Sequence, residues 1–157
     1  MSSQETFHES HGNITCSLRR LIDVNVCTRE LRRNPRLLIY GKCVAEEYPE
    51  IFKQFAKDRV ALAVCLEAEH MNMVGFKLAS MAARLDLKEI VVLTVDGSPH
   101  CVQLHMMVEE VNKFFSNRLN IKHIVIEEGR IVEIDSKCVK VARYLSRIQK
   151  LILRQST

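Results

Sequence analysis

The sequence predicts a three-layer α/β/α domain with a mainly parallel sheet of four to five strands and an extra N-terminal helix. Short apolar segments alternate with longer segments of helical periodicity, which is the order of βαβ units. Three of the short segments are apolar throughout, as expected of parallel strands covered on both faces. The 157 residues include only 5 Gly and 3 Pro, which argues against a turn-rich all-β sandwich and favours helices with short connections.

The N-terminal part of the chain divides into a loose segment and a helix. Residues 1–13 are polar and aperiodic, so we expect a flexible N-terminus followed by a single α/β domain over residues 14–157. From Cys16 to about Arg33, apolar residues recur at spacings of three to five, which predicts the extra helix. Asn34-Pro35 ends it, because the residue before a proline is disfavoured in the helical conformation.

The remaining elements follow in alternating order. Strands are predicted over 36–41, 60–65, 89–95 and 121–126, with a short fifth strand over 130–134. Helices are predicted over 45–57, 71–85, 99–119 and 136–153. Ser98 is a suitable N-cap and Pro99 suits the first helical position. The crossovers between the first strands should be right-handed, so these strands should be parallel.

Charge and apolar runs exclude several classes of protein. The net charge is +4, from 23 basic and 19 acidic residues, and the chain has no Trp, which disfavours nucleic acid as a partner. The longest apolar run, 60–66, is far shorter than the roughly 20 residues of a membrane span, and no signal peptide is recognisable, so we expect a cytoplasmic protein. Basic residues concentrate near the start, either as a solvated helix face or as a docking surface for an acidic partner or phosphate. They are Arg19, Arg20, Arg29, Arg32, Arg33 and Arg36, against Asp23 and Glu30.

Cysteines and histidines follow three successive predicted strands. The chain has 6 Cys but no CxxC or CxxxC, so any cysteine site must be assembled by the fold. Cys43 follows the first strand, Cys65 ends the second, and His100, Cys101 and His105 follow the third. Ligands of parallel sheets bind outside the carboxyl ends of the strands, and we expect the second strand to lie between the first and third. Thiolates with imidazoles suit zinc or an iron–sulfur cluster, so these five residues form the predicted metal site.

Two other interpretations of these residues stay open. In the first, Cys101 is the nucleophile or redox thiol of an enzyme, with His100 beside it, because a helix start favours the thiolate. The turn at Asp96, Gly97 and Ser98 is then a candidate cofactor-binding segment, because the helix start after it attracts anions. In the second, the protein is an interaction module without a ligand, and its cysteines serve packing. Packing is also the expected role of Cys16, Cys27 and Cys138.

The layout of these segments resembles a known family. IYGKC (39–43), AVCLEAEH (63–70) and VDGSPHCVQLH (95–105) are similar in arrangement to the delta subunit of methyl-viologen-reducing hydrogenases, over about residues 36–150. That family consists of small α/β iron–sulfur proteins that relay electrons between a hydrogenase and heterodisulfide reductase; only Cys43 stands where the family has a pair of cysteines. The resemblance implies a redox-associated accessory protein with an iron–sulfur cluster. It would work with a larger oxidoreductase or as a homo-oligomer.

Overall fold

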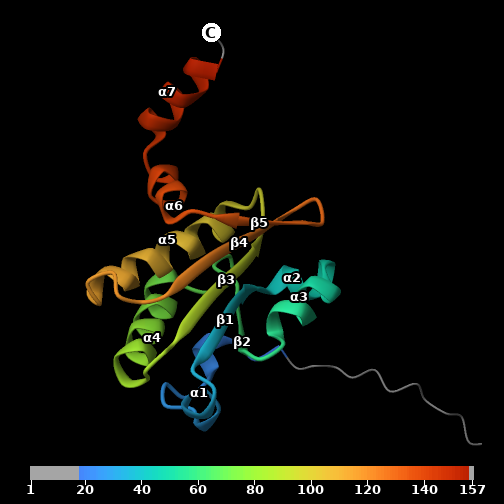
Figure 1. The fold of residues 1–157 in the computed structure, drawn as a ribbon, viewed down its shortest axis with the longest axis vertical. Coiled ribbons are helices and arrows are strands. Elements are labelled where there is room, and N and C mark those ends of the chain that lie inside the picture. The colour runs from blue at the N-terminus through green and yellow to red at the C-terminus, as the bar shows by residue number, and fades with distance from the viewer. Residues whose placement is uncertain (1–17, 156–157) are drawn as a thin grey trace, which may run out of the picture.

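A computed structural model describes residues 18–155, and Figure 1 shows how they are arranged. The predicted loose segment 1–13 and Cys16 lie outside the described residues. Within these residues a five-stranded sheet forms the middle layer, in the order β2-β1-β3-β4-β5. The strands are β1 (Arg36–Gly41), β2 (Val60–Val64), β3 (Glu89–Val95), β4 (Ile121–Glu127) and β5 (Arg130–Ile134). The first four are parallel and β5 is antiparallel to β4.

Helices cover the sheet on both faces, which confirms the predicted three-layer class (Figure 1). One face is covered by α4 (Met71–Arg84) and α5 (Pro99–Phe114), and the other by α2 (Lys42–Glu47) and α3 (Pro49–Ala56). Near the C-terminus, α6 (Ser136–Ala142) lies beside α5, and α7 (Leu145–Gln155) extends away from the body of the domain (Figure 1).

Strand β1 shows why the apolar runs are continuous. Its residues Leu37 and Ile39 pack under α4 and α5, whereas Leu38 and Tyr40 pack against the opposite helices. All four are almost completely buried, and each such side chain contributes about 1.5–3 kcal/mol relative to an exposed one. The two cores therefore meet in the sheet itself.

The order of the strands differs from the expected one. We expected the second strand between the first and third, but β1 is hydrogen-bonded to β2 on one side and to β3 on the other. The chain leaves β1 over one face to reach β2, then returns over the other face through α4 and passes β1 to form β3. Because these strands are about equally apolar, their sequences do not distinguish the two orders.

The predicted continuous helix over 16–33 is wrong for the described residues. The chain forms a short 3₁₀ helix, η1 (Leu21–Asp23), and a short α-helix, α1 (Arg29–Arg33). Ala63 donates its backbone N–H to the carbonyl of Arg19 (2.8 Å), so the segment before η1 runs along the outer side of β2. Between the two helices, the Asn25 side chain accepts the N–H of Cys27 (2.8 Å), a local bond that competes with helix formation.

Three predicted helices are also shorter or divided. The predicted helix 45–57 forms α2 and α3, because Pro49 lacks the N–H needed inside a helix but is tolerated at the start of α3. Helix α5 ends at Phe114 rather than near 119. It stops there because Ser116 and Asn117, just beyond its end, adopt the left-handed conformation (φ 55° and 57°). The predicted helix 136–153 forms α6 and α7.

An ion cluster around the buried carboxylate of Glu89 joins the amino ends of the parallel strands. The carboxylate of Glu89, at the start of β3, is 2.9 Å from Arg59 Nε, 3.2 Å from Arg36 Nε and 3.3 Å from Lys122 Nζ. Arg59 directly precedes β2, Arg36 is the first residue of β1, and Lys122 lies in β4. The hydrogen bond from Arg59 is the main reason that the pKa of Glu89 falls to about 2, against the opposing effect of burial.

We expect the Glu89 cluster to make stability depend on acid pH. A carboxyl group whose pKa is lowered by folding stabilises the protein above its ordinary pKa of 4.5 and loses this contribution as the pH falls toward 2. The wild-type free energy of unfolding should therefore fall by about 3 kcal/mol more than that of Glu89→Gln over this interval. Urea unfolding at several pH values measures this difference in the free energy of unfolding. The control is Glu133→Gln, which removes an exposed carboxylate of β5. Equal pH slopes for wild type and Glu89→Gln would contradict this role.

Candidate functional site

The structure brings the three predicted cysteines to the carboxyl end of the sheet, the end at which the neighbouring strands β1, β2 and β3 finish. Gly41 at the end of β1 pairs with Val64 at the end of β2. Cys43 lies in the first turn of α2, Cys65 directly follows β2, and Cys101 lies in the first turn of α5. The altered strand order leaves this convergence intact, because the three strands are still adjacent.

Cys43 and Cys101 flank the place where the chain changes face. The segment after β1 continues on one face of the sheet and the segment after β3 on the other, and ligands of open α/β sheets bind in the crevice at such a point. The sulfur of Cys101 lies 3.7 Å from the position that a Cβ on Gly41 would take. The Cys101 side chain therefore lies over Gly41 at the end of β1, and Gly41 is only two residues before Cys43 in the sequence.

The thiol of Cys43 is sensitive to the groups around it. The pKa of Cys43 is raised, first by partial burial, then by the carboxylate of Glu47 and by the thiolates of Cys101 and Cys65. Negative charge at this end of the sheet thus disfavours the Cys43 thiolate. A cationic ligand would reverse this effect and favour that thiolate.

Glu69 supports Cys65 from the following turn. Its Oε2 accepts the backbone N–H of Cys65 at 2.7 Å. Its Oε1 is buried and accepts no hydrogen bond from the described residues. Both residues line a cavity of about 350 Å³ beside the end of β2, together with the cationic side chains of Arg20 and Lys42. Arg20 is paired with Asp23 and Lys42 with Glu46, so cations and carboxylates are balanced in this part of the site.

The turn between β3 and α5 holds the predicted cofactor-binding residues. Asp96 donates its backbone N–H to the carbonyl of Ile126 (3.0 Å), and Gly97 adopts a positive φ of 87° that other residues rarely adopt. Ser98 caps α5, with its hydroxyl oxygen accepting the Cys101 N–H at 3.4 Å. The turn thereby holds Cys101 at the start of the helix.

The two histidines of the predicted set lie in different surroundings. His100 is half-buried in the first turn of α5, next to Cys101. His105 is almost completely buried where α5 packs on the sheet. Its Nε2 is 2.9 Å from Thr94 Oγ1, and its Nδ1 is 2.9 Å from Nδ1 of His123. Both ring nitrogens of His105 are thus engaged in hydrogen bonds. Within residues 18–155, no group of three His, Cys, Asp or Glu side chains is arranged to hold a metal ion.

His105 belongs to a buried chain of four polar side chains, because His123 continues it to Glu109 through a 2.8 Å contact between Nε2 and Oε1. All four residues are at most 5% exposed. The bonds form one unbroken series when the Thr94 hydroxyl donates to His105, His105 donates to His123 and His123 donates to Glu109, with both rings neutral. Burial, reinforced by His123, lowers the pKa of His105 to about 3, which favours the neutral ring.

Sequence reasoning missed Thr94, Glu109 and His123 as partners of His105. Glu109 lies four residues after His105 and so shares its helix face, and His123 interrupts an apolar strand. A polar residue at an apolar position is the signal that could have revealed this chain.

The packing role predicted for Cys138 is wrong, because its side chain is exposed. Cys27, the other described cysteine with this predicted role, is half-buried.

Comparison with known proteins gives the family but no individual relative. A family model described as a Rossmann-like domain matches residues 30–156. No curated protein and no solved structure matches the chain. Among the helices of residues 18–155, none combines the length and apolar character required to cross a membrane.

We expect His105 to remain uncharged at pH 5. Its pKa of about 3, compared with an ordinary 6.5, follows chiefly from burial. Nitrogen-15 NMR of the imidazole rings distinguishes neutral from charged histidine, and His105→Gln identifies the signals that belong to this residue. An imidazolium pattern for His105 at pH 5 would show that the buried chain is protonated differently.

Proposed function

We propose that this chain, which belongs to the Rossmann-like domain family, is a cytoplasmic redox-associated accessory protein that holds an iron–sulfur cluster or a zinc ion at the carboxyl end of its sheet. The observation that carries this proposal is the convergence of Cys43, Cys65 and Cys101 from three strand ends. Two of them flank the crevice in which ligands of such sheets bind.

The donor chemistry supports a soft metal or a cluster. Thiolates are the preferred ligands of zinc and of iron–sulfur clusters. A cationic group would also favour the thiolate of Cys43, whose pKa is raised by partial burial and then by nearby negative charges. Of the two predicted imidazoles, we assign His100 as the additional ligand, because both nitrogens of His105 are already engaged. Binding requires the side chains to close around the group. A cluster would supply one-electron transfer, and zinc would supply structural closure.

The protein's own residues have separate tasks in this proposal. Glu69 holds the backbone of Cys65, and Ser98 holds that of Cys101. Cys43 is exposed and supplies the thiol that releases its proton when the group binds. The five cysteines within residues 18–155 are free thiols, which supports a reducing compartment. A larger oxidoreductase is the proposed partner, on the resemblance of the three cysteine segments to the hydrogenase delta subunit.

Substitution of single cysteines tests the site. Protein purified without oxygen should contain iron and sulfide with a visible absorption band, or zinc, and Cys43→Ser, Cys65→Ser and Cys101→Ser should each lose most of it. Cys27→Ser is the matched control, because Cys27 lies between η1 and α1, beside Pro35 and Lys88 near the amino ends of the strands, and it should retain the metal. Retention should also weaken as the pH falls, since binding displaces thiol protons.

Other results would overturn the metal proposal. Metal-free protein in which Cys101 alone is alkylated rapidly would favour an enzyme with Cys101 as nucleophile or redox thiol. Full metal content in all three cysteine variants would place the metal elsewhere. Thermal midpoints of each variant separate loss of ligand from loss of fold.

A second candidate function, an interaction module acting as a homo-oligomer, is favoured by an apolar groove between α4 and α5. The groove has a volume of about 570 Å³, and Phe76 and Phe114 at its sides are 77% and 76% exposed. The occupant we propose is α7 of a second copy, with its exposed Leu145 and Leu151. Helix α7 extends away from the body of the domain (Figure 1), so its exposed apolar side chains can contact the groove of another copy.

Exchange of α7 predicts a dimer that single polar substitutions disrupt. Light scattering after gel filtration should give a dimer for the wild type and a monomer for Phe76→Ser or Leu151→Ser, because each change places a polar group in an apolar contact. Ile131→Ser, an exposed position of β5 outside the groove, should stay dimeric. A wild-type monomer at all concentrations, or equal effects of all three changes, would exclude this arrangement.

A further inference from the structure

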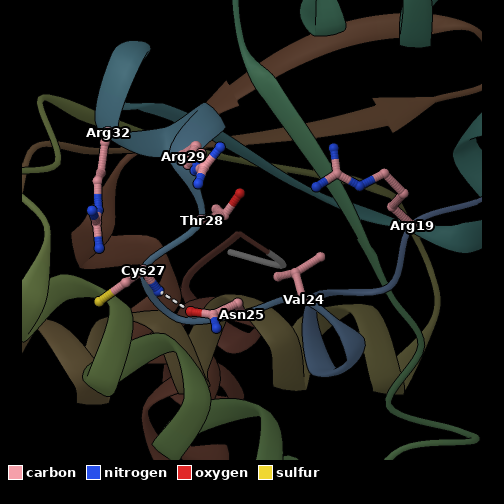
Figure 2. A pocket seen from close by; sticks show the side chains of 7 residues that line it. All are labelled: Arg19, Val24, Asn25, Cys27, Thr28, Arg29 and Arg32. Atoms are coloured by element: carbon pink, nitrogen blue, oxygen red, sulfur yellow. Dashed lines mark hydrogen bonds between the residues drawn. The ribbon is translucent and has the colours of Figure 1, made fainter.

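A second cavity lies beside the outer strand β2, between the segment that precedes η1 and the start of α1. Its volume is about 590 Å³, which is within the range of small-molecule sites. Figure 2 shows Arg19 and Arg32 on opposite sides of the cavity, with Thr28 and Arg29 between them. The other lining residues are Val24, Asn25 and Cys27.

The polar groups of this cavity are chiefly hydrogen-bond donors. Three guanidinium groups and the Thr28 hydroxyl contribute to its wall. The amide oxygen of Asn25 already accepts the N–H of Cys27, which leaves the amide NH₂ to donate. No acidic side chain lines the cavity. A lining of this kind matches a ligand that offers only acceptors.

The positive charge at the cavity is only partly balanced. Nearby, Arg20 is paired with Asp23, and Arg19 is paired with Glu30. Within residues 18–155, by contrast, no carboxylate forms an ion pair with Arg29 or Arg32. Two uncompensated guanidinium groups therefore face one cavity, and their mutual repulsion favours an anion between them.

We propose that this cavity binds the phosphate group of a small phosphorylated molecule through Arg19, Arg29 and Arg32. A guanidinium group can donate two parallel hydrogen bonds to two oxygens of one phosphate. A phosphate monoester carries about −1.5 to −2 charges at pH 7. It therefore balances the two uncompensated arginines better than a carboxylate ligand, which carries a single negative charge. No aromatic side chain lines the cavity, so it recognises the phosphate rather than a stacked base. The basic segment noted in the sequence thereby gains a specific role.

Phosphate titration with matched variants tests the proposal. Calorimetry and phosphorus NMR of the full chain with inorganic phosphate and with glycerol phosphate should show saturable binding. Arg29→Gln and Arg32→Gln should each weaken it about tenfold or more, as expected for the loss of one charge-assisted hydrogen bond. Arg33→Gln is the matched control, because Arg33 is an exposed residue of the same helix but does not line the cavity.

Several outcomes would overturn it. Equal weakening by Arg33→Gln would indicate a diffuse basic surface, and the absence of saturable binding at millimolar phosphate would exclude the site. Vesicles that contain phosphatidic acid form a separate arm: binding to vesicles without binding to soluble phosphates would assign the cavity to a lipid surface instead. Unchanged circular dichroism and thermal midpoints exclude unfolding, since both substituted side chains are exposed.

Discussion

Strand β1 is hydrogen-bonded along both sides and buried on both faces, and the rest of the structure depends on this constraint. A strand in this position needs helices above and below it, so the two crossovers next to it lie on opposite faces. The connections that leave β1 and β3 therefore separate at the carboxyl end of the sheet. The crevice between them is a consequence of covering β1, and Cys43 and Cys101 lie beside it.

The two ends of the sheet have opposite chemistry. At the amino end, Glu89 binds three cations from neighbouring strands and holds those strands together. At the carboxyl end, partial burial raises the pKa of Cys43, and the neighbouring carboxylates and thiols raise it further. The first arrangement is complete in itself and serves stability. The second is relieved by a cation, which is why we place the functional site there.

The buried chain from Thr94 to Glu109 connects stability with the candidate site. It attaches the middle of α5 to β3 and β4 through hydrogen bonds of 2.8–2.9 Å. Cys101 lies one turn before His105 on the same helix, so this attachment also determines where the thiol lies. His105 thus acts on the site through the helix. The arginine cavity and the α4–α5 groove involve other residues, and their tests are independent of Cys43, Cys65 and Cys101.

The sequence alone determined where the strands lie. Strands 36–41, 89–95 and 130–134 have the predicted bounds, because apolar runs and turn residues act over a few positions. Only the tertiary structure decided that β1 lies between β2 and β3, that residues 21–33 form two short helices instead of one, and that His105 bonds Thr94 and His123. Periodicity indicates which side chains are buried, but it carries no information about the distant residue against which each one packs.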